Sequence, residues 1–211
     1  MRKLELTLKA VEALEALYPD AVCSLQYSDA FQLLIATRLS AQCTDARVNM
    51  VTPALFSAFP NAKSMAKADL SKVESLIKTC GLYKTKAKDL IGIAQMIVND
   101  FGGTVPDNIE DLTKLPGVGR KTANLVCGDI YGHPAVVCDT HFIRLCNRLN
   151  LVNTTNALKV EKEMLRLLPP DKSSDFCHRA VLFGRDICTS RKAFCEKCPM
   201  NDFCPKNIKR K

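Results

Sequence analysis

Apolar side chains recur along this chain at helical spacing, and turn residues separate them into short groups. An apolar residue at every third or fourth position lies on one face of a helix and predicts packing against a core. Three such stripes stand out: Phe31, Leu34 and Ile35; Leu90, Ile91, Ala94, Ile97 and Val98; and Phe142, Leu145, Cys146 and Leu149. We therefore expect an all-α protein of about nine or ten short helices.

Local signals refine this helical prediction. Asp29 and Gln32 have the spacing of a capping box ahead of the first stripe. Strand-like alternation is nearly absent, and its best candidate, residues 135–137, is too short to build a sheet. The turn-forming stretch YGHP at residues 131–134 predicts a division of the chain into two parts.

The charge balance favours a polyanionic partner. Thirty Lys and Arg residues against 22 Asp and Glu residues give a net charge of +8, which suits nucleic acid. No apolar run approaches membrane-spanning length. Glu5, Glu12 and Glu15 interrupt the apolar residues of the N-terminal segment, which therefore differs from a signal peptide. We expect a cytosolic protein with no membrane partner.

Four of the eleven cysteines are gathered in the pattern C-x6-C-x2-C-x5-C, namely Cys188, Cys195, Cys198 and Cys204. Thiolates this close in sequence can converge on one centre, and they predict a structural metal site with no open position for substrate. Tetrahedral zinc and a [4Fe–4S] cluster both accept four thiolates, so the spacing leaves the two open. The other cysteines, among them Cys43 and Cys80, are scattered and fit small core residues.

The segment TSRKAF lies between the first two of these cysteines and carries Arg191 and Lys192. A metal that holds this loop rigid would present a basic surface to DNA phosphates. A solvated loop with no partner is the alternative that composition leaves open.

The stretch LPGVG predicts a tight turn between two helices, a helix-hairpin-helix. Gly117 and Gly119 allow the backbone to turn and another backbone to approach closely, with Val118 between them. The first amides of the second helix then point outward beside a positive helix dipole, where a phosphate can bind. Arg120 and Lys121 follow directly, so we expect DNA phosphate contacts here.

Lys121 stands in the first turn of that helix, where the dipole and Arg120 both disfavour its ammonium form. A neutral lysine amine is a nucleophile that can form a Schiff base. Asp139, in VVCDTHFIRL, precedes the third apolar stripe as a helix cap that stays ionised, and it can support charge in a transition state. Capping alone is the alternative for Asp139, and a solvated surface position is the alternative for Lys121.

These motifs occur in the order found in endonuclease III. The resemblance rests on LLIATRLSAQCTD, GLYKTKA, LPGVGRKTANLV, CDTHFIRLCNRL and the four-cysteine pattern, from about residue 4 to residue 206. It implies two helical domains: a six-helix domain, residues 24–134, with the hairpin, and a second domain, residues 1–23 plus 135–211, with a [4Fe–4S] cluster on the four cysteines. It further implies a monomeric, nucleoid-associated bacterial enzyme of the cytoplasm.

The resemblance also implies an activity and a set of roles. The family removes oxidised pyrimidines from duplex DNA and cleaves the abasic site by β-elimination through a lysine Schiff base. Lys121 matches the catalytic lysine and Asp139 the catalytic aspartate, while Gln42 matches the residue that fills the vacated base stack. Leu82 matches the wedge on the opposing strand, although the residues alone favour a solvated amide for Gln42 and a core position for Leu82.

Two residues depart from the family pattern: Arg38 stands where an apolar residue is common, and Cys43 follows the glutamine. Two other functions compete with the one above. Adenine-excising relatives share the cluster and the aspartate but lack the lysine and carry an extra C-terminal domain. A non-catalytic DNA-binding module held together by zinc would be colourless and would cleave no strand.

Overall fold

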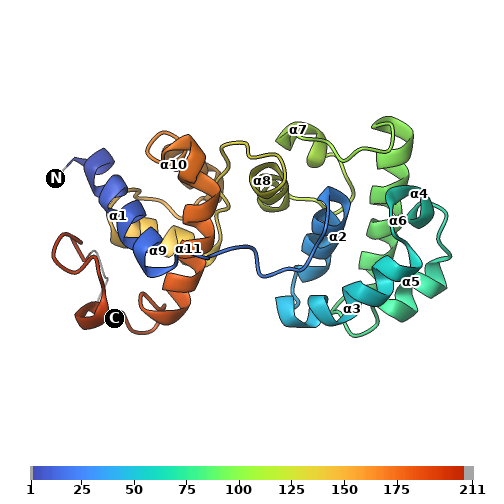
Figure 1. Cartoon of the computed structure of the whole chain (residues 1–211), viewed down its shortest axis with the longest axis horizontal. Helices are drawn as coiled ribbons and strands as arrows, with labels where there is room; N and C mark the ends of the chain where they lie inside the picture. Colours follow the sequence, from blue (N-terminus) through green and yellow to red (C-terminus); the bar gives the residue numbers. More distant parts are fainter. Residues whose placement is uncertain (1, 207–211) are drawn as a thin grey trace. The chain divides into compact units, whose positions relative to one another are not determined.

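The computed structural model describes residues 2–206, and over that range it contains helices and no strand (Figure 1). An isolated bridge joins Cys188 and Ala193. The helices are α1 (Lys3–Leu17), α2 (Ala30–Ser40), α3 (Asp45–Ala58), α4 (Ala62–Met65), α5 (Leu70–Leu76), α6 (Tyr83–Asp100), α7 (Ile109–Leu112), α8 (Arg120–Asp129), α9 (Thr140–Arg148), α10 (Ala157–Met164) and α11 (Ser173–Asp186), with 3-10 turns at Pro170–Lys172 and Cys195–Lys197. The predicted all-α class is confirmed.

The expected number of helices was too low, because two helices have a single turn. α4 and α7 contain 4 residues each, too few for an apolar period to show in the sequence. Each begins at an asparagine, Asn61 or Asn108, whose side chain accepts the amide hydrogen three residues later. A capping side chain therefore defines these helices where periodicity cannot.

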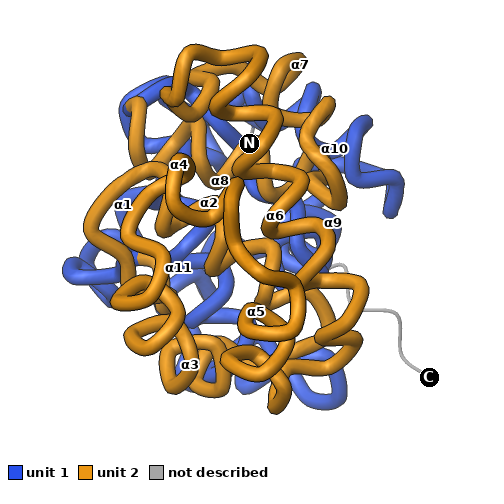
Figure 2. Tube along the Cα trace, turned by 90° about the vertical axis from the view of Figure 1, so that its right-hand side faces the viewer, with its two compact units in different colours: residues 1–22, 132–211 blue, residues 23–131 orange. Residues whose placement is uncertain are grey.

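The chain forms two compact units (Figure 2). The central unit is residues 23–131, and the terminal unit joins residues 1–22 to residues 132–211. The terminal unit is thus assembled from both ends of the sequence, and residues 1 and 207–211 of the predicted cluster domain lie outside the described residues. The central unit contains seven α-helices, α2 to α8, against six in the sequence-based prediction, and the single-turn α4 and α7 are among them.

The core of the central unit lies between α2, α6 and α8. Leu34 and Ile35 of α2 are fully buried, as the first apolar stripe predicts. On α6, Leu90, Ala94 and Ile97 are fully buried, while the flanking positions 91 and 98 are half-buried. α6 therefore presents a narrow apolar face to the core and covers α2.

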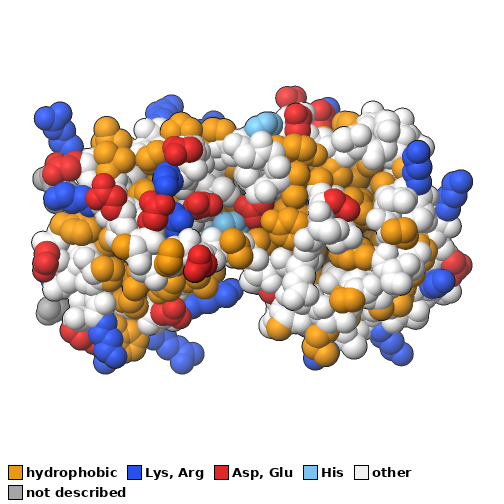
Figure 3. All heavy atoms as spheres, viewed as in Figure 1, with side chains coloured by type: hydrophobic (Ala, Val, Ile, Leu, Met, Phe, Trp, Pro, Cys, Tyr) orange, Lys and Arg blue, Asp and Glu red, His pale blue; other side chains and the backbone are white. Residues whose placement is uncertain are grey.

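The core of the terminal unit lies between α1, α9 and α11. The third apolar stripe is buried along its whole length, in Phe142, Leu145, Cys146 and Leu149. Phe142 of α9 meets Phe176 of α11 edge to face, with ring centroids 5.9 Å apart. On the face drawn in Figure 3, acidic and basic side chains are interspersed over the helices of this unit, so that face carries no field of a single sign.

The capping box predicted ahead of α2 is half formed. Asp29 accepts the Gln32 backbone amide at 2.8 Å, as expected. The Gln32 side chain accepts the backbone amide of Ser28 at 3.1 Å instead of that of Asp29. Asp29 therefore caps the helix, while Gln32 anchors the residue before the cap. Among the described residues, no helix has the length and apolar character that crossing a membrane requires.

Candidate functional site

The predicted helix-hairpin-helix is present, with α7 and α8 joined by a tight turn. The Val118 amide donates to the Leu115 carbonyl at 3.1 Å and closes this turn. Gly117 has φ +67°, a conformation that glycine adopts without strain. Val118 is only 6% exposed, so its contribution to an outward-facing surface is limited to its backbone.

The hairpin turn packs closely against an ion pair between α2 and α6. A Cβ added to Gly117 would lie 2.3 Å from Arg38 Nε and 2.8 Å from Asp89 Oδ2. Arg38 Nε donates to Asp89 Oδ2 at 3.0 Å, and Arg38 Nη2 contacts the same oxygen. The side chains are mostly buried, at 14% and 20% exposure. Arg38, which the sequence marks only as a departure from the family pattern, thus supports the hairpin.

α8 begins without a side-chain cap. Its N-cap residue is Gly119, which has an extended backbone. Because glycine has no side chain, it offers no side-chain acceptor for the first amides of the helix. The side chains of Arg120 and Lys121 are exposed at this end. An uncapped helix start beside basic side chains is suited to bind an anion such as a phosphate.

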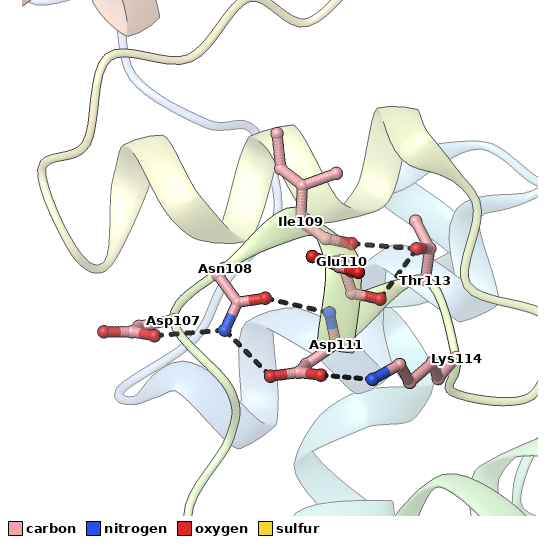
Figure 4. A network of polar contacts seen from close by, with 7 residues as sticks. All are labelled: Asp107, Asn108, Ile109, Glu110, Asp111, Thr113 and Lys114. Carbon is pink, nitrogen blue, oxygen red and sulfur yellow. Dashed lines mark hydrogen bonds and ion pairs between the residues drawn. The ribbon is translucent and has the colours of Figure 1, made fainter.

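Two lysines flank the hairpin and differ in their surroundings. Lys114 Nζ donates to Asp111 Oδ1 at 2.7 Å, inside the network that Asn108 organises at the start of α7 (Figure 4). This hydrogen bond to Asp111 raises the pKa of the Lys114 amine. The side chain of Lys121 has no hydrogen bond or ion pair with another residue of the described range and is exposed. Of these two amines, that of Lys121 is the one left open to an external ligand.

Asp139 is the N-cap of α9, as predicted. Its Oδ1 accepts the Phe142 backbone amide at 2.7 Å, and its side chain is half-buried. The hydrogen bond fixes the carboxyl group at the start of the helix. Asp139 belongs to the terminal unit and Lys121 to the central unit, so each is positioned by the local structure of its own unit.

Gln42 and Leu82 lie on neighbouring loops of the central unit. A Cβ added to Gly81 would stand 3.3 Å from the Gln42 carbonyl oxygen. Both residues have left-handed backbones, with φ of 55° and 57°, which costs energy in a residue other than glycine and is frequent at functional sites. Leu82 is 62% exposed, so the core position that the residues alone favour is wrong. Two strained, exposed residues side by side mark a candidate contact surface.

The four clustered cysteines line one pocket of the terminal unit, together with Arg148 and Phe183. All four are free thiols. Burial, and more weakly the neighbouring thiols, raise the pKa of Cys198 and Cys204. Arg148 Nη1 lies 3.2 Å from Cys188 Sγ. In residues 2–206 no three donor side chains are grouped closely enough to hold a single metal ion.

The loop after Cys188 is ordered by its own contacts. Thr189 Oγ1 donates to the Lys192 carbonyl at 2.6 Å and accepts its amide at 3.2 Å. The Lys192 ammonium lies 5.0 Å from the centre of the Phe194 ring. Arg191 and Lys192 are both exposed, so the loop presents two cations from a backbone that the hydrogen bonds between Thr189 and Lys192 hold in place.

Comparison with known proteins places the chain in a class of DNA repair proteins. Residues 35–170 match the family described as HhH-GPD superfamily base excision DNA repair protein. The chain is similar over 98% of its length to an endonuclease III solved in a non-covalent complex with DNA, with a TM-score of 0.89, 36% identity and 97% of that chain covered. A thermostable thymine-DNA glycosylase gives a TM-score of 0.87 at 26% identity, over 96% of this chain and 97% of the other.

Curated relatives narrow the class to one family. The chain is 44% identical to the endonuclease III of Synechocystis, over 91% of this chain and 88% of that protein. It is 40% identical to the endonuclease III of Bacillus subtilis, over 92% of this chain and 89% of that protein. The chain belongs to the endonuclease III family, which confirms the resemblance seen in the sequence.

Proposed function

We propose that this protein is a bifunctional DNA glycosylase of base excision repair. It removes oxidised pyrimidines from duplex DNA and cleaves the resulting abasic site by β-elimination. The observation that carries the proposal is the exposed Lys121 in the first turn of an uncapped helix, directly after the Gly117 turn. The two alternative functions do not account for this amine. Adenine-excising relatives lack the lysine, and a non-catalytic DNA-binding module needs no nucleophile.

DNA phosphates bind at the start of α8. The helix dipole and the uncapped amides attract the anion, and the exposed Arg120 adds a cation. Gly117 and Gly119 allow the phosphate to approach the backbone, and Val118 contributes its backbone alone. Arg191 and Lys192 offer further phosphate contacts from the terminal unit. Such contacts hold the duplex in register without reading its sequence.

The reaction begins with the damaged nucleotide flipped out of the duplex. Lys121 Nζ attacks C1′ of its sugar, the bond to the base breaks, and the base takes up a proton as it leaves. The nitrogen then expels the ring oxygen O4′, which takes up a second proton, and the opened sugar is joined to the lysine as an imine. The imine makes the neighbouring C2′ hydrogen acidic, and β-elimination then breaks the strand on the 3′ side. The Asp139 carboxylate accepts the lysine proton or stabilises positive charge on the sugar. Its capping bond to Phe142 holds it in one orientation.

Gln42 and Leu82 support base flipping. Gln42 fills the stack that the flipped nucleotide leaves, and Leu82 inserts as an apolar wedge on the opposing strand. Both residues are exposed and have left-handed backbones. Such strained conformations in residues other than glycine are concentrated at functional sites, which supports these roles.

Cys188, Cys195, Cys198 and Cys204 hold a [4Fe–4S] cluster. All four line one pocket and none forms a disulfide, which is compatible with a multi-iron group, and the Arg148 guanidinium beside Cys188 offsets thiolate charge. The bound cluster supplies a structural crosslink, and the loop with Arg191 and Lys192 lies between its first two ligands. We assign the two units as the hairpin and cluster domains of a monomeric, nucleoid-associated cytoplasmic enzyme.

Borohydride trapping tests the function. On duplex DNA with an oxidised pyrimidine, reduction of the imine should join the wild-type protein covalently to the DNA. Lys121→Ala should lose this adduct yet keep DNA binding. Lys114→Ala is the matched control, because Lys114 is also exposed and lies just before the hairpin, and it should keep full trapping. An adduct that survives in Lys121→Ala would assign the chemistry to another amine.

A further inference from the structure

Cys43 and Cys80 form a pair that their separation in the sequence conceals. Cys43 follows Gln42 directly, and Cys80 lies two residues before Leu82. The loops that carry them meet, since a Cβ added to Gly81 would stand 3.3 Å from the Gln42 carbonyl oxygen, and the Cys43 thiol influences the electrostatics of the Cys80 thiol. Cys43 is half-buried, whereas Cys80 is 1% exposed. Cys80 is a core residue, as the sequence predicts, whereas Cys43 is only partly buried: one of the pair is open to small solutes and the other is shielded.

A buried cation stands beside this pair. Lys86 of α6 is 1% exposed, and its Nζ donates to the Leu39 carbonyl at 2.8 Å. Burial lowers the pKa of the Lys86 ammonium, and the charges of Cys43 and Cys80 act in the opposite direction. Burial raises the pKa of Cys80 to about 11, against the effect of Lys86 and Arg47. A cation near a partly exposed thiol is the setting in which cysteines react with oxidants.

We propose that Cys43 and Cys80 are a reversible modification site, at which a hydroperoxide converts the two thiols to a disulfide. The bond would crosslink the loop that carries Gln42 to the loop that carries Leu82. The Gly81 backbone already stands close to the Gln42 carbonyl, so the two loops need only a small displacement. The consequence for DNA rests on the proposed function, whereas formation of the bond does not.

The chemistry balances with hydrogen peroxide as the oxidant. The Cys43 thiolate attacks one peroxide oxygen, the O–O bond breaks, and the departing hydroxide takes up a proton to leave as water. Cys43 is then a sulfenic acid. The Cys80 sulfur attacks the Cys43 sulfur, the S–O bond breaks, and the released hydroxide takes the Cys80 proton. Two thiols are oxidised and one peroxide is reduced to two waters. A dithiol reverses the change by exchange.

Crosslinking alters the surface that probes the DNA. A disulfide brings the two sulfurs to about 2.05 Å, closer than two thiols in contact, so both loops shift and lose independent motion. Loss of a single energetically important contact residue at an interface commonly weakens binding by about fivefold or more. We expect oxidised protein to bind lesion-containing duplex about tenfold more weakly, with recovery after treatment with a dithiol.

The experiment uses the full-length, cluster-loaded protein, treated with graded hydrogen peroxide. Trypsin should release residues 39–47, LSAQCTDAR, and 79–84, TCGLYK, as one disulfide-linked species from oxidised wild type. Binding to lesion-containing duplex is measured on the same samples before and after dithiothreitol. Cys43→Ala and Cys80→Ala are the matched controls, since they keep the four cluster cysteines and any oxidation there.

Two results support the site: the linked peptides in wild type, and a reversible loss of binding that both variants lack. Absence of the linked peptides after peroxide treatment would overturn the proposal. A disulfide that forms without any change in binding would overturn its effect on DNA. If reduced wild type fails in borohydride trapping, the proposed function is wrong, and the linked peptides still decide the modification site independently.

Discussion

The starts of α8 and α9 solve the same problem in opposite ways. Both helices have several amides that lack partners within the helix. At α9, the Asp139 side chain accepts the Phe142 amide at 2.7 Å. At α8, Gly119 provides no side-chain acceptor, and the side chains of Arg120 and Lys121 are exposed at this end. One helix start is satisfied by its own carboxylate, and the other remains available to an anion from outside.

This difference separates positioning from binding. The cap at α9 fixes a carboxylate in one place, which suits a group that must meet charge in a transition state. With glycine at its N-cap, the start of α8 gives up roughly a few tenths of a kcal/mol of helix stability relative to an aspartate cap, and its first amides are kept for a phosphate. The comparison therefore indicates that α9 is capped to position a carboxylate, whereas α8 gives up a cap to bind DNA. Four substitutions at these two helix starts and the hairpin turn test this difference.

Asp139→Asn should have the largest effect. An asparagine still caps the helix, so the free energy of unfolding should change by less than about 0.5 kcal/mol. Loss of the carboxylate charge should lower the single-turnover rate on an oxidised pyrimidine by about 10²- to 10⁴-fold. Quench-flow kinetics and urea unfolding of the same preparation measure both. A rate within a few-fold of wild type would reduce Asp139 to a capping residue.

Gly117→Ala should come next, with a stability loss of about 2–5 kcal/mol. The alanine would adopt φ +67°, which costs about 1–2 kcal/mol, and its Cβ would displace the Arg38–Asp89 ion pair, which adds about 1–3 kcal/mol. Gly102→Ala is the control, because Gly102 has φ +62° and open space around it. Equal losses in the two variants, measured by urea unfolding, would refute the packing contribution.

Gly119→Asp converts the start of α8 into a copy of α9. The new carboxylate can accept the helix amides, and no atom lies within 4 Å of its Cβ, so stability should rise by a few tenths of a kcal/mol, roughly. DNA affinity should fall about tenfold or more, because the added charge occupies the phosphate site. Gly119→Asn, which caps without charge, should lose less. Unchanged affinity in both, by fluorescence anisotropy, would exclude this helix start from the interface.

The smallest effect should be the difference in stability between Asp139→Ala and Asp139→Asn. Removing the cap leaves the Phe142 amide unpaired and should lower the free energy of unfolding by about 1 kcal/mol more than Asp139→Asn does. The two variants should have similar catalytic rates, since both lack the carboxylate. Urea unfolding of the pair isolates the value of the hydrogen bond. Indistinguishable stabilities would show that the hydrogen bond from Phe142 orients the Asp139 carboxylate without adding to the free energy of unfolding.

Sequence reasoning succeeded where the interactions are local. Asp139 and Asp29 lie three residues before the amides they accept, so a short window contains both partners. It failed for contacts made by packing. Leu82 is exposed although it looks like a core residue, and the single-turn helices α4 and α7 leave no periodic trace. The family resemblance supplied the role of Leu82, which the residues alone do not indicate.

The sequence by itself determined the helical class, the glycine hairpin, the lysine that follows it and the set of four cysteines, because each depends on spacing within a few residues. Tertiary structure decided that Arg38 of α2 and Asp89 of α6 fill the space beside Gly117, and that the loop with Cys43 lies beside the loop with Cys80. Arg38 and Asp89 come from two helices that pack against each other, and Cys43 and Cys80 from the loops that follow α2 and precede α6. Their identity depends on the orientation of whole helices, which no short stretch of sequence specifies.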